Sequence, residues 1–147
     1  RLMNMGVEPY LITSSLTLIV AQRLARTNCN DCIEEDQSIE PEKKESQLRA
    51  IGFSAEEASR VILYKGKKGG CKKCNNTGYK GRRGIYEVLR ISDNLIEAIL
   101  NESTTLELLK IAKEKDNFVT MQQVGRMFLQ QGDISLEEYK RILIIDQ

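Results

Sequence analysis

Apolar residues recur at helical spacing over the last third of the chain, which predicts several short helices after residue 92. Serine or threonine stands where each helix would begin, at Ser92, Thr104, Thr120 and Ser135. The last three are each followed three positions later by Glu107, Gln123 or Glu138, which is the spacing of a capping box. Gly132 ends one run. We expect the apolar residues of these runs to form a core: Leu106, Leu108, Leu109, Ile111, Met127, Phe128 and Leu129.

The beginning and middle of the chain combine helical and extended patterns. A first helix is expected to end near Gly6, and a second to follow Pro9 and run through residues 16–20. Ala21–Arg26 alternates and predicts a strand, as does the β-branched run 85–91. The natural arrangement pairs these two strands, with the intervening residues as an insertion between them. The fold class expected is therefore α+β, mostly helical.

The insertion itself has polar and turn-rich segments. An acidic loop is expected over Glu34–Glu45, followed by a short helix that Ser54 and Glu57 open with a capping box. Residues 75–84 are basic and contain three glycines, which favours a turn-rich segment before the returning strand.

Charge is unevenly distributed along the 147 residues, although the net charge is only +1. Residues 33–59 carry eight carboxylates and three basic side chains, whereas residues 60–90 carry ten basic side chains and one carboxylate. The total therefore indicates no anionic partner, but the local basic block is a candidate contact surface. The most apolar stretch, residues 10–24, is too short and too polar to span a bilayer, so we expect a soluble, cytoplasmic setting.

All four cysteines fall into two Cys-x-x-Cys pairs, Cys29 with Cys32 and Cys71 with Cys74. Two intervening residues let both sulfurs of one pair turn toward the same ion, and two such knuckles supply a tetrahedral set of ligands. The chain has no histidine, so the site can only be all-thiolate. These residues predict one structural zinc ion, whose excess negative charge the nearby lysines would offset.

Other uses of the cysteines fit less well. Two disulfides would suit an oxidising compartment, for which the sequence has no targeting signal. A thioredoxin-type motif would need one pair rather than two, and catalytic zinc would need an open ligand position. Iron in a four-sulfur site remains an alternative, because ligand geometry alone does not separate it from zinc.

Several motifs occur in an order that resembles a known family. They are Arg1–Ser15, the Ala21-Gln-Arg-Leu-Ala-Arg26 element, the two cysteine pairs, and Gly78-Tyr-Lys-Gly-Arg-Arg-Gly-Ile-Tyr-Glu-Val-Leu89. This order resembles the C-terminal part of the secretion ATPases that drive type IV pilus assembly and type II secretion. The resemblance covers nearly the whole chain and is weakest after about residue 101. It implies that this chain, which begins at Arg1, is a piece of a longer protein.

The resemblance implies a division of the chain and a setting for it. Residues 1–27 would be the last elements of a RecA-like ATPase core, 28–80 the zinc-binding tetracysteine module, 81–91 the returning strand and 92–147 a C-terminal helical extension. The parent protein would be a homohexameric motor on the cytoplasmic face of the inner membrane. Its partners would be neighbouring subunits and an inner-membrane platform protein, while the fragment alone could be a monomer.

The chemistry of ATP hydrolysis is expected elsewhere in such a parent. The chain has no Gly-x-x-x-x-Gly-Lys-Ser/Thr loop, and Gly66-Lys-Lys-Gly-Gly70 has the wrong spacing to replace one. We therefore expect no catalytic residues, with ATP and Mg²⁺ bound only by the parent. The alternative function is a zinc ribbon that binds nucleic acid, with Tyr64 and Tyr79 stacking on bases. The few aromatic residues and the adjacent acidic loop make nucleic-acid binding the less expected function.

Overall fold

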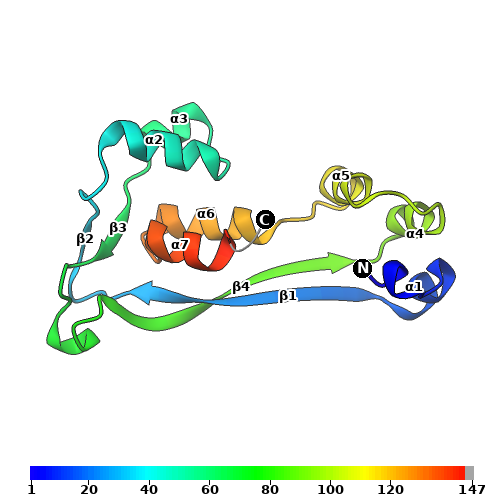
Figure 1. Ribbon diagram of the computed structural model, residues 1–147, viewed down its shortest axis with the longest axis horizontal. Coiled ribbons are helices and arrows are strands. Elements are labelled where there is room, and N and C mark those ends of the chain that lie inside the picture. The colour runs from blue at the N-terminus through cyan, green and yellow to red at the C-terminus, as the bar shows by residue number, and fades with distance from the viewer. Residues whose placement is uncertain (145–147) are drawn as a thin grey trace. The chain divides into compact units, whose positions relative to one another are not determined.

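The computed structural model describes residues 1–144 and confirms an α+β fold (Figure 1). Two compact units divide the chain, and neither is continuous in sequence. One unit comprises Arg1–Ala21 and Tyr86–Thr120, and the other comprises Gln22–Ile85 and Met121–Gln147. The four segments expected from the family resemblance stay a prediction. Within residues 1–144, no helix is both long enough and apolar enough to cross a membrane.

The first unit is built from short helices and the outer ends of two long strands. Its helices are the 3-10 helix Met3–Met5, α1 (Pro9–Ser15), α4 (Asp93–Leu100) and α5 (Thr105–Lys115). Local capping explains the boundaries of α4 and α5: the Ser92 and Thr104 side chains accept the backbone N–H of Leu95 and Glu107. The buried core of this unit is small and consists of Ile12, Leu95, Ile99 and Ala112.

The second unit contains the cysteines and the larger core. Strands β1 (Leu18–Asn28) and β4 (Tyr79–Arg90) pair with each other, and β2 (Ile33–Glu35) pairs antiparallel with β3 (Tyr64–Gly66). Helices α2 (Pro41–Ala50) and α3 (Ala55–Arg60) lie between β2 and β3 in sequence, and α6 (Met121–Gln131) and α7 (Leu136–Leu143) follow at the end of the chain. The core draws on all four helices and on both long strands: Ala25, Leu48, Phe53, Ala58, Val61, Leu63, Ile85, Met121, Phe128, Leu129, Ile134, Leu136, Tyr139 and Ile142.

The strand pairing was predicted correctly, but both strands begin earlier than expected. The predicted helix after Pro9 is confirmed as α1, but its continuation through residues 16–20 is wrong, since α1 ends at Ser15 and β1 begins at Leu18. The N–H of Ile91 donates to the carbonyl of Thr17 at 3.0 Å, so strand pairing outweighs local helix propensity here. β4 likewise starts at Tyr79, within the segment predicted to be turns.

The expected acidic loop over Glu34–Glu45 is also wrong in part, because β2 and the start of α2 lie within it. Helix α2 is mostly polar and has Leu48 as its buried residue, so hydrophobic periodicity does not reveal it. Pro41 at its first turn is compatible with a helix start.

Two of the expected core residues are exposed. The exposed fractions are 79% for Leu106 and 50% for Met127, whereas Phe128 and Leu129 are buried as predicted. Leu108 and Ile111 are partly buried against the small core of the first unit. Helical spacing places all of these residues on helices. Whether each side chain is buried depends on which other elements pack against that turn of the helix.

Candidate metal centre

The two cysteine pairs meet at the ends of β1 and β2 and at the 3-10 helix Lys72–Cys74. The sulfur atoms of Cys29, Cys32, Cys71 and Cys74 all lie within 4.8 Å of one another. Cys29 and Cys74 are buried, and Cys32 and Cys71 are partly exposed. The tertiary structure therefore brings together all four residues that the sequence predicts as metal ligands.

The spacing of the sulfurs fits a tetrahedral metal ion. The Sγ–Sγ distances are 3.8 Å for Cys29 and Cys71, 3.9 Å for Cys32 and Cys74, and 3.7 Å for Cys71 and Cys74. A tetrahedron with metal–sulfur bonds of about 2.3 Å has edges of about 3.8 Å. A disulfide would need its two sulfurs at about 2.05 Å, so these cysteines are free thiols, close enough together to hold one metal ion.

Backbone N–H groups support the second knuckle. The N–H groups of Cys71 and Gly78 donate to the sulfur of Cys74 at 3.1 and 3.2 Å. The first of these hydrogen bonds is the largest cause that lowers the pKa of Cys74 to about 6, since it favours the thiolate. Burial instead raises the pKa of Cys32 to about 12. The two N–H donors therefore favour the thiolate form of Cys74, which is the form that would bind a metal ion.

The small β2–β3 sheet links the residues just after the first cysteine pair to those just before the second. Ile33 pairs with Gly66, and the N–H of Lys67 donates to the carbonyl of Cys32 at 2.9 Å. A Cβ atom on Gly66 would lie 2.2 Å from the carbonyl oxygen of Gly78, so only glycine permits this approach. The insertion thus closes on itself next to the four cysteines.

Part of the basic segment is neutralised within the chain. Lys73 pairs with Asp31, and Lys65 pairs with Asp36, each at 3.3 Å. Arg83 pairs with Asp133 and also lies 3.8 Å above the ring of Phe128. These contacts explain part of the charge pattern as internal ion pairs.

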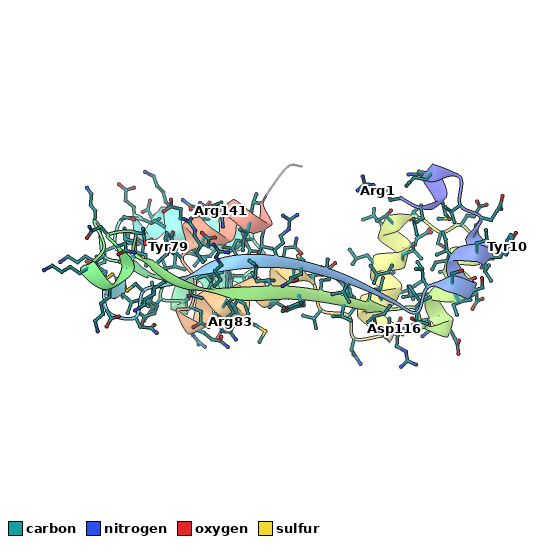
Figure 2. The ribbon with its side chains drawn as sticks, turned by 90° about the horizontal axis from the view of Figure 1, so that it is seen from below. Arg1, Tyr10, Tyr79, Arg83, Asp116 and Arg141 are labelled. Atoms are coloured by element: carbon teal, nitrogen blue, oxygen red, sulfur yellow. The ribbon has the colours of Figure 1, made fainter. Side chains whose placement is uncertain are left out.

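Sequence reasoning missed an ion-pair cluster that joins β1 to α7 around the buried carboxylate of Glu138. Glu138 is 0% exposed, and its carboxylate accepts hydrogen bonds from Arg26 at 2.8 Å and Arg141 at 3.0 Å. Ser135 caps α7 as predicted, but the Glu138 carboxylate turns to the two arginines instead of completing the capping box. Tyr79, Arg83 and Arg141 all lie at the end of the long strands where α6 and α7 pack (Figure 2).

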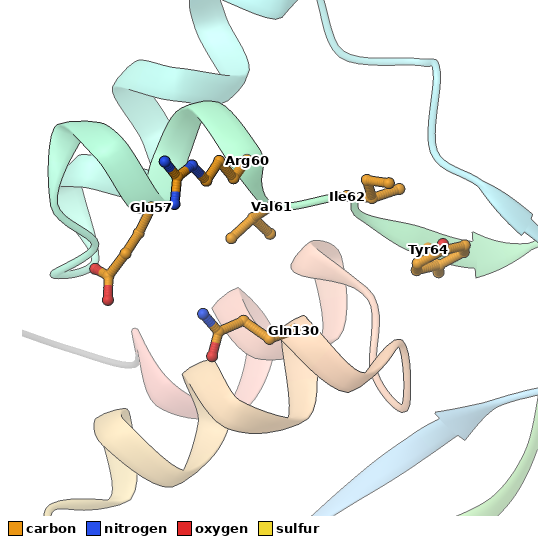
Figure 3. A pocket seen from close by; sticks show the side chains of 6 residues that line it. All are labelled: Glu57, Arg60, Val61, Ile62, Tyr64 and Gln130. Carbon is orange, nitrogen blue, oxygen red and sulfur yellow. The ribbon is translucent and has the colours of Figure 1, made fainter.

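A surface hollow in the same unit has no catalytic arrangement. It encloses about 380 Å³ and is lined by Glu57, Arg60, Val61, Ile62, Tyr64 and Gln130 (Figure 3). Its charged groups have structural partners: Glu57 accepts the N–H of Ser54 at 2.8 Å, and Arg60 pairs with Glu56 at 2.8 Å. The tetracysteine cluster is therefore the better candidate for the functional site.

Comparison with known proteins agrees with this architecture. The model of a family described as "Type II/IV secretion system protein" matches residues 1–141. The chain belongs to this family. It is 40% identical to the type II secretion system ATPase E of Vibrio cholerae over 145 residues. This alignment covers 97% of the chain and 26% of the relative. It is 36% identical to the type IV pilus assembly ATPase PilB of Myxococcus xanthus over 138 residues. This alignment covers 94% of the chain and 23% of that relative.

The family assignment confirms the resemblance drawn from the motifs. The comparison also shows how much of each relative the chain matches. This member of the secretion family spans about a quarter of the length of these two relatives. The similarity therefore concerns one part of proteins that are named as ATPases.

Proposed function

We propose that this chain is the non-catalytic, C-terminal, zinc-binding portion of a motor ATPase for type II secretion or type IV pilus assembly. The observation that carries the metal assignment is the clustering of four free cysteines, whose sulfur atoms all lie within 4.8 Å of one another, with three of the six separations at 3.7–3.9 Å. Four thiolates leave no open ligand position, so the ion has a structural role. Zinc fits the all-sulfur ligand set and the tetrahedral spacing.

Metal analysis of the purified chain tests the site directly. We expect one zinc ion per chain, and we expect Cys71→Ser to lose it, whereas Lys72→Ser, an exposed residue between two ligands, retains it. Chelation should also speed hydrogen exchange across residues 29–78, because metal binding contributes folding free energy to a small module. A folded wild-type chain that purifies without metal and takes up none would overturn the assignment.

The motor assignment rests on the family and on the names of its relatives. In the parent protein, this portion would couple neighbouring subunits of a homohexamer on the cytoplasmic side of the inner membrane, next to a platform protein. ATP and Mg²⁺ would be bound by the remainder of the protein, because this sequence has no phosphate-binding loop. We expect no phosphate release from ATP by the purified chain. ATP hydrolysis that copurifies with it and survives Cys71→Ser would contradict this.

The apolar surface of the first unit supports its role as part of a larger domain. A groove of about 590 Å³ in this unit is lined mainly by apolar side chains. Three consecutive strand residues remain exposed there, Leu18 at 49%, Ile19 at 44% and Val20 at 53%. Contiguous exposed apolar surface marks a contact face, which is consistent with residues 1–27 completing an ATPase core.

The structure weakens the nucleic-acid alternative, because both candidate tyrosines have contacts within the chain. Arg26 lies 4.2 Å above the ring of Tyr79, and the Tyr79 hydroxyl pairs with Ser135 at 3.1 Å. The Tyr64 ring is only 3.1 Å from where a Cβ of Gly132 would lie. We expect no salt-dependent binding of single-stranded DNA or RNA at low ionic strength, and such binding would restore the alternative.

A further inference from the structure

Asn28, the residue before Cys29, contacts the turn between the two C-terminal helices. Asn28 is 3% exposed, and its side-chain Nδ2 donates to the carbonyls of Tyr64 at 3.2 Å and Gly132 at 3.0 Å. Its backbone N–H donates to the carbonyl of Asp133 at 2.8 Å. Gly132 and Asp133 form the turn between α6 and α7, so one residue joins β1, β3 and this turn.

These contacts determine where Cys29 lies. The backbone of Asn28 is held by the α6–α7 turn, and the next N–H, that of Cys29, donates to the carbonyl of Gly78 at 2.9 Å. Cys29 is therefore positioned from one side by the C-terminal helices and from the other by the second knuckle. Cys29 is 0% exposed, so its sulfur has little freedom to adjust if either side moves.

Both long strands are also held to α7 close to the metal centre. On β1, Arg26 pairs with Glu138 at 2.7 Å, and at the start of β4 the Tyr79 hydroxyl pairs with Ser135 at 3.1 Å. Ser135 and Glu138 belong to the first turn of α7. The four cysteines therefore lie at the end of two strands that are each held by the same helical turn.

We propose that Asn28 is the positioning residue that couples metal binding at the tetracysteine centre to the docking of α6 and α7. The inference rests on the metal site proposed above and adds a partner element to it. Coupling of this kind is reciprocal: docked helices raise the affinity for zinc, and bound zinc strengthens helix docking by the same factor. The C-terminal helices thus act as part of the metal module, although 46 residues separate Cys74 from Met121 in the sequence.

Asn28→Leu is the sharpest perturbation. In the described part of the chain, Oδ1 of Asn28 has no hydrogen-bond partner, so leucine, which keeps the branching at Cγ but is larger, removes the two donated bonds and no accepted one. We expect the affinity for zinc, measured by competition with a chromogenic chelator, to fall about tenfold or more, as for other residues that orient metal ligands. The matched control is Asn30→Leu, an exposed residue within the first knuckle, which should change the affinity less than about twofold.

Hydrogen exchange supplies a second readout, whose first comparison needs only the wild-type chain. Zinc should slow exchange in α6 and α7 of the wild-type chain as well as around the cysteines, and in Asn28→Leu it should protect the cysteine knuckles alone. Unchanged exchange in wild-type α6 and α7 on zinc binding would overturn the coupling, and so would wild-type affinity in a folded Asn28→Leu. Failure of the metal site itself is distinguishable, because the wild-type chain would then bind no zinc.

Discussion

Glu138 permits a quantitative test of how the C-terminal helices are held. Its fully buried carboxylate is contacted by two guanidinium groups, whose side chains remain 43% exposed for Arg26 and 52% for Arg141. Glu138→Gln keeps the size of the side chain but removes its charge and places amide hydrogens against guanidinium donors. Glu137→Gln is the matched control, because Glu137 is the exposed preceding residue on the same helix.

The expected loss of stability in Glu138→Gln follows from the two arginines that would lose their charged partner. A hydrogen bond to a charged group contributes about 1.5–3 kcal/mol, and the lower end applies because both arginines can regain water when the carboxylate is lost. Two such partners give a decrease of about 3 kcal/mol in the free energy of unfolding. For a chain of this size, that corresponds to a decrease of about 10 °C in Tm.

The pH dependence gives an independent check. Burial alone would raise the pKa of Glu138, but hydrogen bonds from Arg141 and Arg26 together hold it below its ordinary value of 4.5. A carboxyl group with a lowered pKa in the folded state stabilises the fold fully above its unfolded value and loses that contribution as pH falls through the folded value. The difference between the two variants should therefore be constant near neutral pH and shrink below about pH 4.5.

The assay is equilibrium urea unfolding followed by far-ultraviolet circular dichroism, because the chain has no tryptophan to report by fluorescence. Both variants are measured with saturating zinc near neutral pH and without metal in the acid series. Equal unfolding free energies for Glu138→Gln and Glu137→Gln would refute the reasoning. A difference that persists unchanged at pH 3 would show that it does not come from the charge.

Two further pairs of substitutions test the packing. Gly66→Ala should weaken zinc binding about tenfold, because its Cβ would lie 2.2 Å from the Gly78 carbonyl oxygen and must displace the second knuckle. Gly69→Ala, with φ +81° and open space around it, should cost about 1 kcal/mol of stability and leave zinc affinity intact; equal zinc affinities in a chelator competition would contradict this. Leu63→Ala, at 1% exposure, should lower the unfolding free energy by about 2–5 kcal/mol, and Leu106→Ala, at 79%, by less than about 0.5 kcal/mol. Similar urea midpoints for the two leucine variants would refute the core assignment.

Local patterns predicted several helix starts and the pairing of the two long strands. Ser54, Ser92, Thr104 and Ser135 all cap helices, because a capping side chain reaches only three residues along the chain. The predicted continuation of the second helix through residues 16–20 is wrong for the opposite reason. Its backbone groups pair with β4, some seventy residues later, and no short window of sequence contains that partner.

The sequence by itself determined the candidate ligand set, because two Cys-x-x-Cys pairs without any histidine restrict a metal site to four thiolates. It also carried the family resemblance that the comparison confirmed. Only the tertiary structure decided how that site is supported. Arg26 and Glu138 are separated by 112 residues, and Asn28 and Gly132 by 104. Such contacts depend on how the core packs α6 and α7 against the strands, and a pattern confined to neighbouring residues does not specify that packing.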